Sequence, residues 1–157
     1  MNAEQKQVLY QEAEKELISI TEGETNVTAL MATISCILAQ KFDYYFWTGF
    51  YIVDPAKENE LVVGPYQGTL GCLRIPFGRG VCGTAAATLK TQVVEDVHAF
   101  PGHIACDSRS NSEIVVPVLN AQGQLIAVLD VDSVETGSFD DTDRIALETL
   151  MQRIFAQ

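Results

Sequence analysis

Hydrophobic residues recur at helical spacing through the first third of the chain. Between Val8 and Ile20 the apolar positions lie three or four residues apart, and Gly23 then interrupts the pattern. Thr25 or Asn26 can cap a second helix, whose apolar residues fall on one face: Val27, Leu30, Met31, Ile34 and Leu38. The sequence therefore predicts two amphipathic helices before any strand.

The pattern then changes to one that is typical of strands. Residues 44–53 are rich in aromatic and β-branched side chains, and a turn containing Asp54 and Pro55 separates them from a second apolar run at 61–66. These two segments predict a hairpin. Residues 69–75 predict a short third strand that carries Cys72.

The second half of the chain mixes short helices, strands and one long loop. We expect a short helix at 80–89 with Cys82 near its start, a short strand at 92–94, and a loop at 95–112 whose length is typical of a functional segment. Two apolar strands at 113–119 and 124–131 predict a second hairpin.

Asp140 is then the expected cap of a last helix with a clear apolar stripe. This order of elements predicts an α+β fold in one domain, residues 1–157. Its sheet is mostly antiparallel and central, and it is flanked by the N- and C-terminal helices.

Composition excludes several classes of protein. Ten basic against 21 acidic side chains give a net charge of −11, and no cluster of Lys and Arg offsets it, so we expect neither a nucleic-acid partner nor a membrane partner. The N-terminal residues lack the pattern of a signal peptide. Four cysteines in such a chain are typical of a reducing compartment, and we expect the cytoplasm.

Cys106 lies where a structural cysteine is unusual. It belongs to a polar, turn-rich stretch, residues 100–108, that runs into an apolar strand, whereas structural cysteines are normally small buried hydrophobes. This setting predicts a thiol placed for chemistry. Cys36, among small residues of the second helix, is interpreted as a packing residue. Cys82 stays open between an inert and a reactive thiol, because a helix start both buries and acidifies a thiol.

The sequence does not favour two other kinds of site. His98, His103 and Cys106 are zinc-ligand types, but their spacing does not match the paired spacings of structural zinc sites, so no metal is expected. Residues 78–83 match the dinucleotide pattern G-x-G-x-x-G without its parallel βαβ context. We interpret these glycines as permitting a tight turn into the short helix, and we expect no cofactor.

An acidic cluster and an aromatic pair complete the candidate chemistry. Asp130 and Asp132 are two residues apart on a strand and therefore share a face, which Glu113 of the preceding strand can join. Clustered carboxylates repel, so at least one should have a raised pKa and can donate a hydrogen bond while another binds an ammonium. Trp47 and Tyr51 also share a face, as core or as the wall of a ligand pocket.

Taken together, these segments resemble the free methionine-(R)-sulfoxide reductases, which are single GAF domains. The resemblance covers nearly the whole chain, and the cysteine spacing within it is specific. The segments that carry it are 64–68, 72–75, 78–83, 91–94, 96–108, 112–117 and 129–133. One departure is Thr69-Leu70-Gly71 before Cys72, where the family has a more polar sequence.

The resemblance implies a GAF fold and a reaction. Cys106 takes the oxygen of free L-methionine (R)-S-oxide and becomes a sulfenic acid. Cys72 then forms a disulfide with it, thioredoxin reduces that disulfide, and Cys82 is a supporting or alternative resolving thiol. Glu113, Asp130 and Asp132 match the acids that hold the sulfoxide oxygen and the amine.

Trp47 and Tyr51 match the wall around the methylthio group of the substrate. The thiol pKa, the oligomeric state and an alternative function stay open. The acids and Asp107 would raise the pKa of the Cys106 thiol. Either His98, His103, Arg74 or Arg109 offsets this effect, or the attack relies on activation of the substrate. GAF domains commonly pair through helices, so the resemblance allows a homodimer that no feature of this sequence specifies. The alternative function is a non-catalytic GAF sensor of a small ligand or of oxidants.

Overall fold

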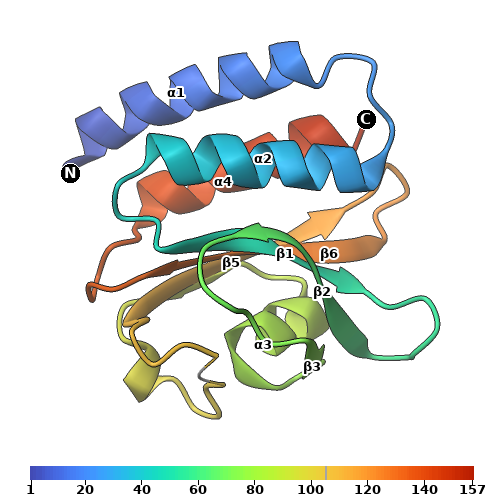
Figure 1. Ribbon diagram of the computed structural model, residues 1–157, viewed down its shortest axis with the longest axis vertical. Helices are drawn as coiled ribbons and strands as arrows, with labels where there is room; N and C mark the ends of the chain where they lie inside the picture. Colours follow the sequence, from blue (N-terminus) through green and yellow to red (C-terminus); the bar gives the residue numbers. More distant parts are fainter. Residues whose placement is uncertain (105) are drawn as a thin grey trace.

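The computed structural model describes residues 1–104 and 106–157. A central sheet separates three long helices from a shorter helix and its loops (Figure 1). Over one face lie α1 (Ala3–Ile20), α2 (Val27–Lys41) and α4 (Asp141–Phe155). The short helix α3 (Gly80–Thr88) lies on the opposite face and precedes the 3-10 turn η1 (Val97–Ala99).

The sheet has six strands in the order β3-β2-β1-β6-β5-β4, and all its neighbouring strands run antiparallel. The strands are β1 (Trp47–Val53), β2 (Glu60–Gln67), β3 (Arg74–Pro76), β4 (Gln92–Val94), β5 (Ser112–Leu119) and β6 (Leu125–Ser133). The predicted α+β class, with a central antiparallel sheet and helices at both termini, is confirmed.

Helix caps explain where the helices begin. The side chains of Asn2 and Gln5 cap each other's backbone N–H groups, so α1 starts at Ala3 and not at Val8 as predicted. Of the two candidate caps of α2, Asn26 accepts the hydrogen bond from the N–H of Ala29. Asp140 caps α4 as expected.

The predicted strand around Cys72 is displaced toward the C-terminus. The strand is Arg74–Pro76, and Cys72 lies in the loop before it. The indole N–H of Trp47 donates a hydrogen bond to the Thr69 carbonyl oxygen at 2.8 Å. This contact draws residues 69–72 across the end of β1, away from the extended path along β2.

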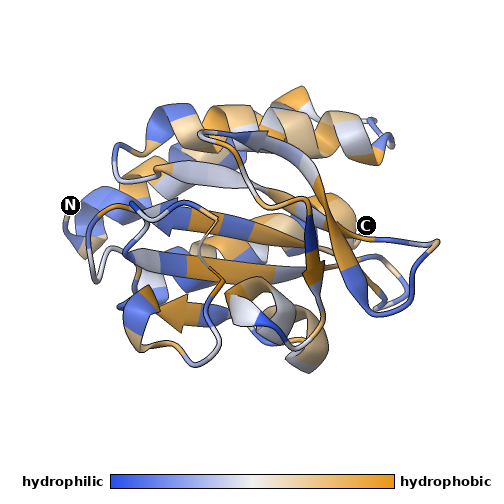
Figure 2. Cartoon of the chain, turned by 60° about the horizontal axis from the view of Figure 1, so that its bottom comes forward, coloured by the Kyte–Doolittle hydropathy of each residue, from blue (hydrophilic) through white to orange (hydrophobic). Residues whose placement is uncertain are grey.

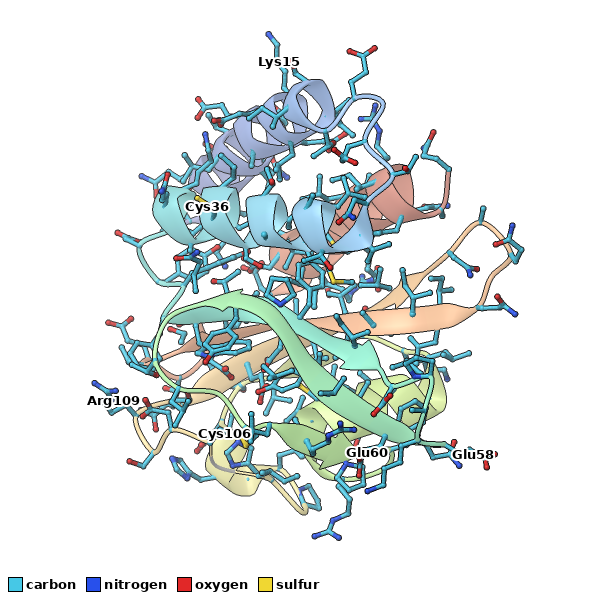
Figure 3. The ribbon with its side chains drawn as sticks, turned by 45° about the vertical axis from the view of Figure 1, so that its right-hand side comes forward. Lys15, Cys36, Glu58, Glu60, Cys106 and Arg109 are labelled. Atoms are coloured by element: carbon cyan, nitrogen blue, oxygen red, sulfur yellow. A yellow bond between two sulfur atoms is a disulfide. The ribbon has the colours of Figure 1, made fainter. Side chains whose placement is uncertain are left out.

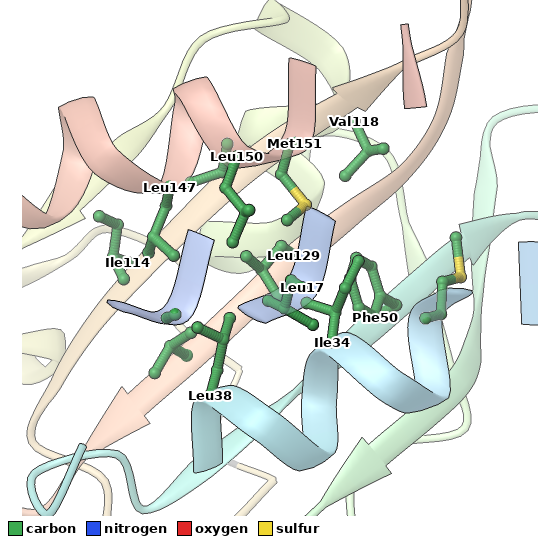
Figure 4. Close-up of a cluster of buried hydrophobic side chains, with 14 of the residues drawn as sticks. Leu17, Ile34, Leu38, Phe50, Ile114, Val118, Leu129, Leu147, Leu150 and Met151 are labelled. Carbon is green, nitrogen blue, oxygen red and sulfur yellow. The ribbon is translucent and has the colours of Figure 1, made fainter. Parts of the chain in front are cut away.

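Each face of the sheet carries its own hydrophobic cluster. The period of two along each strand places Phe50, Ile114 and Leu129 against the helices, where they pack with Leu17 and Ile34 (Figure 4). When the molecule is turned so that the α3 side comes forward, hydrophilic and hydrophobic residues alternate along the strands (Figure 2).

The opposite face packs its own strand residues under α3. Trp47, Tyr51, Val115 and Val128 lie there against α3 and its neighbouring loops. None of the helices in the described part of the chain is long and apolar enough to span a membrane.

Candidate active site

A pocket opens on the face of the sheet that carries α3. It holds about 500 Å³ of empty space, counting its open mouth. It gathers residues from β1, α3, β5, β6 and the loop that follows η1. The sequence-predicted residues in its lining are Trp47, Tyr51, Cys82, Cys106, Glu113, Asp130 and Asp132. Residues spread over most of the chain therefore meet in one place.

Strand register builds the acidic floor of this pocket. Glu113 on β5 pairs with Asp132 on β6, and Asp130 lies two residues away on the same face. On its other side β6 pairs with β1, which sets Trp47 opposite Asp132 and Gly49 opposite Asp130. The expectation that Glu113 joins the two aspartates is met by this register.

Burial decides the charge state of these acids. Glu113 is 5% exposed and Asp130 is 4% exposed. Burial, together with the charges of Asp130 and Asp132, raises the pKa of Glu113 well above its ordinary value. Burial also raises the pKa of Asp130 and of Asp132. A cluster of this kind holds at least one proton near neutral pH, and the three carboxyl groups share it.

One oxygen of Asp130 has no hydrogen-bond partner. Its Oδ1 is buried and finds no donor among the described residues. A buried acceptor of this kind costs free energy unless a donor from a bound molecule satisfies it. Asp130 lines the pocket, so this acceptor suits a donor that enters there.

The Cys82 thiol sits against these carboxyl groups. Its Sγ lies 4.0 Å from Oε2 of Glu113, and its side chain is buried at the start of α3. Burial and the charges of Asp130 and Glu113 raise the pKa of Cys82 well above its ordinary value. The thiol is therefore protonated at neutral pH and a weak nucleophile. Cys82 is also a free cysteine, outside any disulfide.

Cys72 and Cys106 form a disulfide at the mouth of the pocket. Their Cα atoms are 5.3 Å apart, within the usual range for such a bond. Cys106 is exposed and Cys72 is half-buried. Figure 3 shows Cys106 near Arg109, on the other side of the sheet from Cys36. Cys36 lies in α2 and is half-buried.

Polar contacts hold the two cysteine loops together beside the disulfide. The Thr69 hydroxyl donates to Oδ2 of Asp107 at 2.7 Å. Arg109 forms an ion pair with the same carboxylate at 2.8 Å, and its guanidinium lies over the Phe46 ring, 5.0 Å from the centroid. We call these four residues, Thr69, Asp107, Arg109 and Phe46, the loop clasp. It ties both cysteine loops to the start of β1.

Three aromatic rings stack beside the pocket, and two of them, Trp47 and Tyr51, line it. Trp47 stacks on Tyr51 at 5.6 Å and on Tyr66 at 4.8 Å between ring centroids. Gly49 makes room for this stack, because a Cβ there would lie 2.1 Å from the Cβ of Tyr66. Trp47 and Tyr51 are thus both core residues and pocket residues. Tyr66 stacks on Trp47 without lining the pocket, and its position follows from the pairing of β1 with β2.

The two arginines expected to offset the acids around Cys106 form ion pairs with other carboxylates. Arg74 was expected to offset the acids, but it binds Asp54 and Glu60 at the far end of β2 and does not serve the pocket. Arg109 is paired with Asp107. The pocket cation is instead Arg79, just before α3. Sequence reasoning had assigned its segment only to a turn.

His103 does not supply a positive charge to the pocket. His103 lines the pocket, and burial together with His98 lowers its pKa, so the ring is neutral at neutral pH. Nε2 of His98 lies 3.0 Å from the Asn111 side-chain oxygen. In this structure the Cys106 sulfur belongs to a disulfide and is not available as a ligand beside His98 and His103. Gly78 and Gly80 have positive φ angles of 82° and 63°, in agreement with the predicted tight turn.

Comparisons with known proteins agree on the fold. The profile of the GAF domain family matches residues 24–154. A curated relative, the free methionine-R-sulfoxide reductase of Escherichia coli, is 43% identical over 145 residues, which is 92% of this chain and 86% of that protein.

Two solved structures are similar over nearly their full length. The free methionine-R-sulfoxide reductase of Neisseria meningitidis in complex with its substrate superposes with a TM-score of 0.90 at 47% identity, covering 95% of this chain and 87% of that one. The substrate complex of fRMsr of Staphylococcus aureus gives a TM-score of 0.85 at 43% identity, covering 92% of each chain.

Proposed function

Because the chain belongs to the free methionine-(R)-sulfoxide reductases, a family of GAF-domain oxidoreductases, we propose that its pocket binds free L-methionine (R)-S-oxide and that Cys106 reduces it. The observation that supports this proposal is that a disulfide-bonded cysteine lies in one pocket with buried acids. Cys106 lines the same pocket as Glu113, Asp130 and Asp132. The reaction is reduction of a sulfoxide to a thioether.

In the first step the oxygen moves from the substrate to Cys106. The Cys106 sulfur attacks the sulfoxide sulfur, the S–O bond of the substrate breaks, and Cys106 becomes a sulfenic acid while methionine leaves. The oxygen leaves the substrate sulfur readily only when it is protonated or hydrogen-bonded. Glu113 is the proposed donor, since burial and two neighbouring carboxylates keep its proton in place.

The same acids explain why a free amino acid is the proposed substrate. A free amino acid brings an ammonium group, and methionine within a peptide does not. Oδ1 of Asp130 is buried without a partner and suits an N–H donor. Trp47 and Tyr51 form the wall that we assign to the methylthio group.

In the second step Cys72 is the proposed resolving thiol. Its sulfur attacks the sulfenic sulfur of Cys106, a disulfide forms, and the oxygen leaves as water. Support comes from the pairing of these two cysteines and from the loop clasp that holds their loops adjacent. A dithiol reductant of the thioredoxin type then restores both thiols by exchange.

The direct test is an assay that resolves the epimers. We expect the reduced protein to convert free methionine-(R)-sulfoxide to methionine with dithiothreitol or thioredoxin. The (S) epimer and a peptide-bound sulfoxide should remain, because the peptide lacks the ammonium that the acids receive. Failure to consume the free (R) epimer would overturn the proposal. A disulfide that forms with peroxide but without sulfoxide turnover would favour a redox sensor.

Cysteine variants separate the two steps. Cys72→Ser should release about one methionine per protein and then stop with thioredoxin, because its sulfenic acid has no partner. Cys82→Ser should recycle, because its buried, protonated thiol is a weak nucleophile. The measurement is methionine formed per protein in single- and multiple-turnover assays. Normal recycling by Cys72→Ser would transfer the resolving role to Cys82.

A further inference from the structure

The proposed reaction leaves the Cys82 thiol without a step of its own, although the thiol lies in the pocket. One ligand atom from each of Cys82, Glu113 and Asp130 lies within 4.8 Å of the other two. All three side chains are buried. They project from α3, β5 and β6, so regular elements fix their positions.

An independent observation marks this trio as a place for a cation. Oδ1 of Asp130 has no hydrogen-bond partner among the described residues, and Asp130 is only 4% exposed. Asp130 and its two neighbours line the pocket, so a small ion can reach them through its mouth. A metal ion can stabilise such an oxygen in place of a hydrogen-bond donor, because buried charges in proteins are paired or coordinate metals.

The donor set selects the class of metal. One thiolate and two carboxylates suit zinc and the softer cadmium better than magnesium or calcium, which take oxygen ligands alone. Sulfur and oxygen ligands of one tetrahedral zinc ion lie about 3.5 Å apart, given the usual bond lengths. Cys82 Sγ and Glu113 Oε2 are 4.0 Å apart, and all three ligand atoms lie within 4.8 Å of one another, so the site closes on an ion with side-chain shifts of about 1 Å or less. The pocket leaves the fourth position to water.

We propose that Cys82, Glu113 and Asp130 bind a thiophilic divalent cation, Zn²⁺ or Cd²⁺, and that the bound ion excludes the substrate. The proton of Cys82 and the proton held by the carboxyl groups of Glu113 and Asp130 pass to solvent as the metal–sulfur and metal–oxygen bonds form. Arg79 in the lining opposes the ion, whereas Asp132 beside the trio favours it. Metal binding by itself does not depend on the proposed reaction; only the inhibition rests on it.

The disulfide form of the protein offers a clean spectroscopic test. With Cys72 and Cys106 joined, only Cys36 and Cys82 are free thiols. Cd²⁺ should therefore produce its thiolate charge-transfer absorption with one equivalent bound. The band should persist in Cys36→Ser, whose cysteine lies across the sheet, and vanish in Cys82→Ser (Figure 3). A band that survives in Cys82→Ser, or no band in the wild type, would overturn the site.

A second ligand variant guards against a folding artefact. Asp130→Asn keeps the size of the side chain and should weaken Cd²⁺ binding about tenfold or more while the band remains visible at saturation. Thermal unfolding of each variant shows that it is folded. An unchanged affinity in Asp130→Asn would restrict the site to a lone thiol and contradict the proposal.

Inhibition is measured separately on the reduced enzyme. Zn²⁺ should raise the apparent KM for methionine sulfoxide, and a chelator should restore it. Free methionine should also weaken Cd²⁺ binding in the absorption experiment. If the protein turns over no sulfoxide, the proposed function fails while the absorption result still decides the metal site. If it turns over sulfoxide and Zn²⁺ leaves KM unchanged, exclusion of the substrate is wrong.

Discussion

Replacing Cys106 by serine should abolish methionine formation, even within a single turnover. A serine hydroxyl is almost never ionised at neutral pH, and it does not accept the sulfoxide oxygen as a thiolate does. Loss of a nucleophile typically lowers the rate by about 10³-fold or more, so the variant should fall to the background without enzyme. The measurement is methionine released per protein after mixing the reduced enzyme with an equal amount of free (R)-sulfoxide.

The matched control is Cys36→Ser. Cys36 is a free cysteine in α2, on the other side of the sheet from the pocket. It should release methionine at the wild-type rate. Single-turnover activity in Cys106→Ser would move the nucleophile to another cysteine, with Cys72 the first to examine because it shares the disulfide.

Replacing Glu113 by glutamine should lower kcat/KM by about 10²- to 10⁴-fold, the usual contribution of a general acid. The amide keeps the size of the side chain and can donate a hydrogen bond, but it has no proton to transfer to the departing oxygen. Burial and the charges of Asp130 and Asp132 raise the pKa of Glu113. The active, protonated form therefore exists below that raised pKa and is lost as pH rises through it.

The pH profile distinguishes this role from a purely structural one. Wild-type activity should decline on the alkaline side, and Glu113→Gln should lose that decline along with most of its rate. Glu58→Gln is the control, because Glu58 is an exposed carboxylate in the turn between β1 and β2. An alkaline decline that persists in Glu113→Gln would assign it to another group, with Asp132 the next candidate.

Local patterns predicted much of this arrangement. The period of two along a strand was enough to put Asp130 and Asp132 on one face, and Trp47 and Tyr51 on one face. Loop polarity around Cys106 was enough to single out its thiol. These inferences depend only on residues close together in the sequence. The pairing of β6 with β1 then places the aspartates beside the aromatic residues.

Other features depend on contacts that local patterns do not contain. Lys6 is only 4% exposed because it forms an ion pair with buried Asp143 at 2.6 Å, a contact between α1 and α4. Tyr44 also donates to Asp143, which helps explain why β1 begins only at Trp47 and not at the predicted Tyr44. The sequence does not distinguish the roles of Arg74 and Arg79. In the fold, Arg74 pairs with Asp54 and Arg79 lines the pocket.

The span of the Cys72–Cys106 bond links the proposed reaction cycle to the lifetime of the protein. The bond joins residues 34 positions apart, and closing a loop of that size raises the free energy of unfolding by about 3 to 4 kcal/mol on the chain-entropy estimate. If the bond forms once in every turnover, the enzyme that awaits its reductant resists unfolding and proteolysis better than the enzyme that awaits substrate. When reductant runs short, the molecules therefore accumulate in their more durable form.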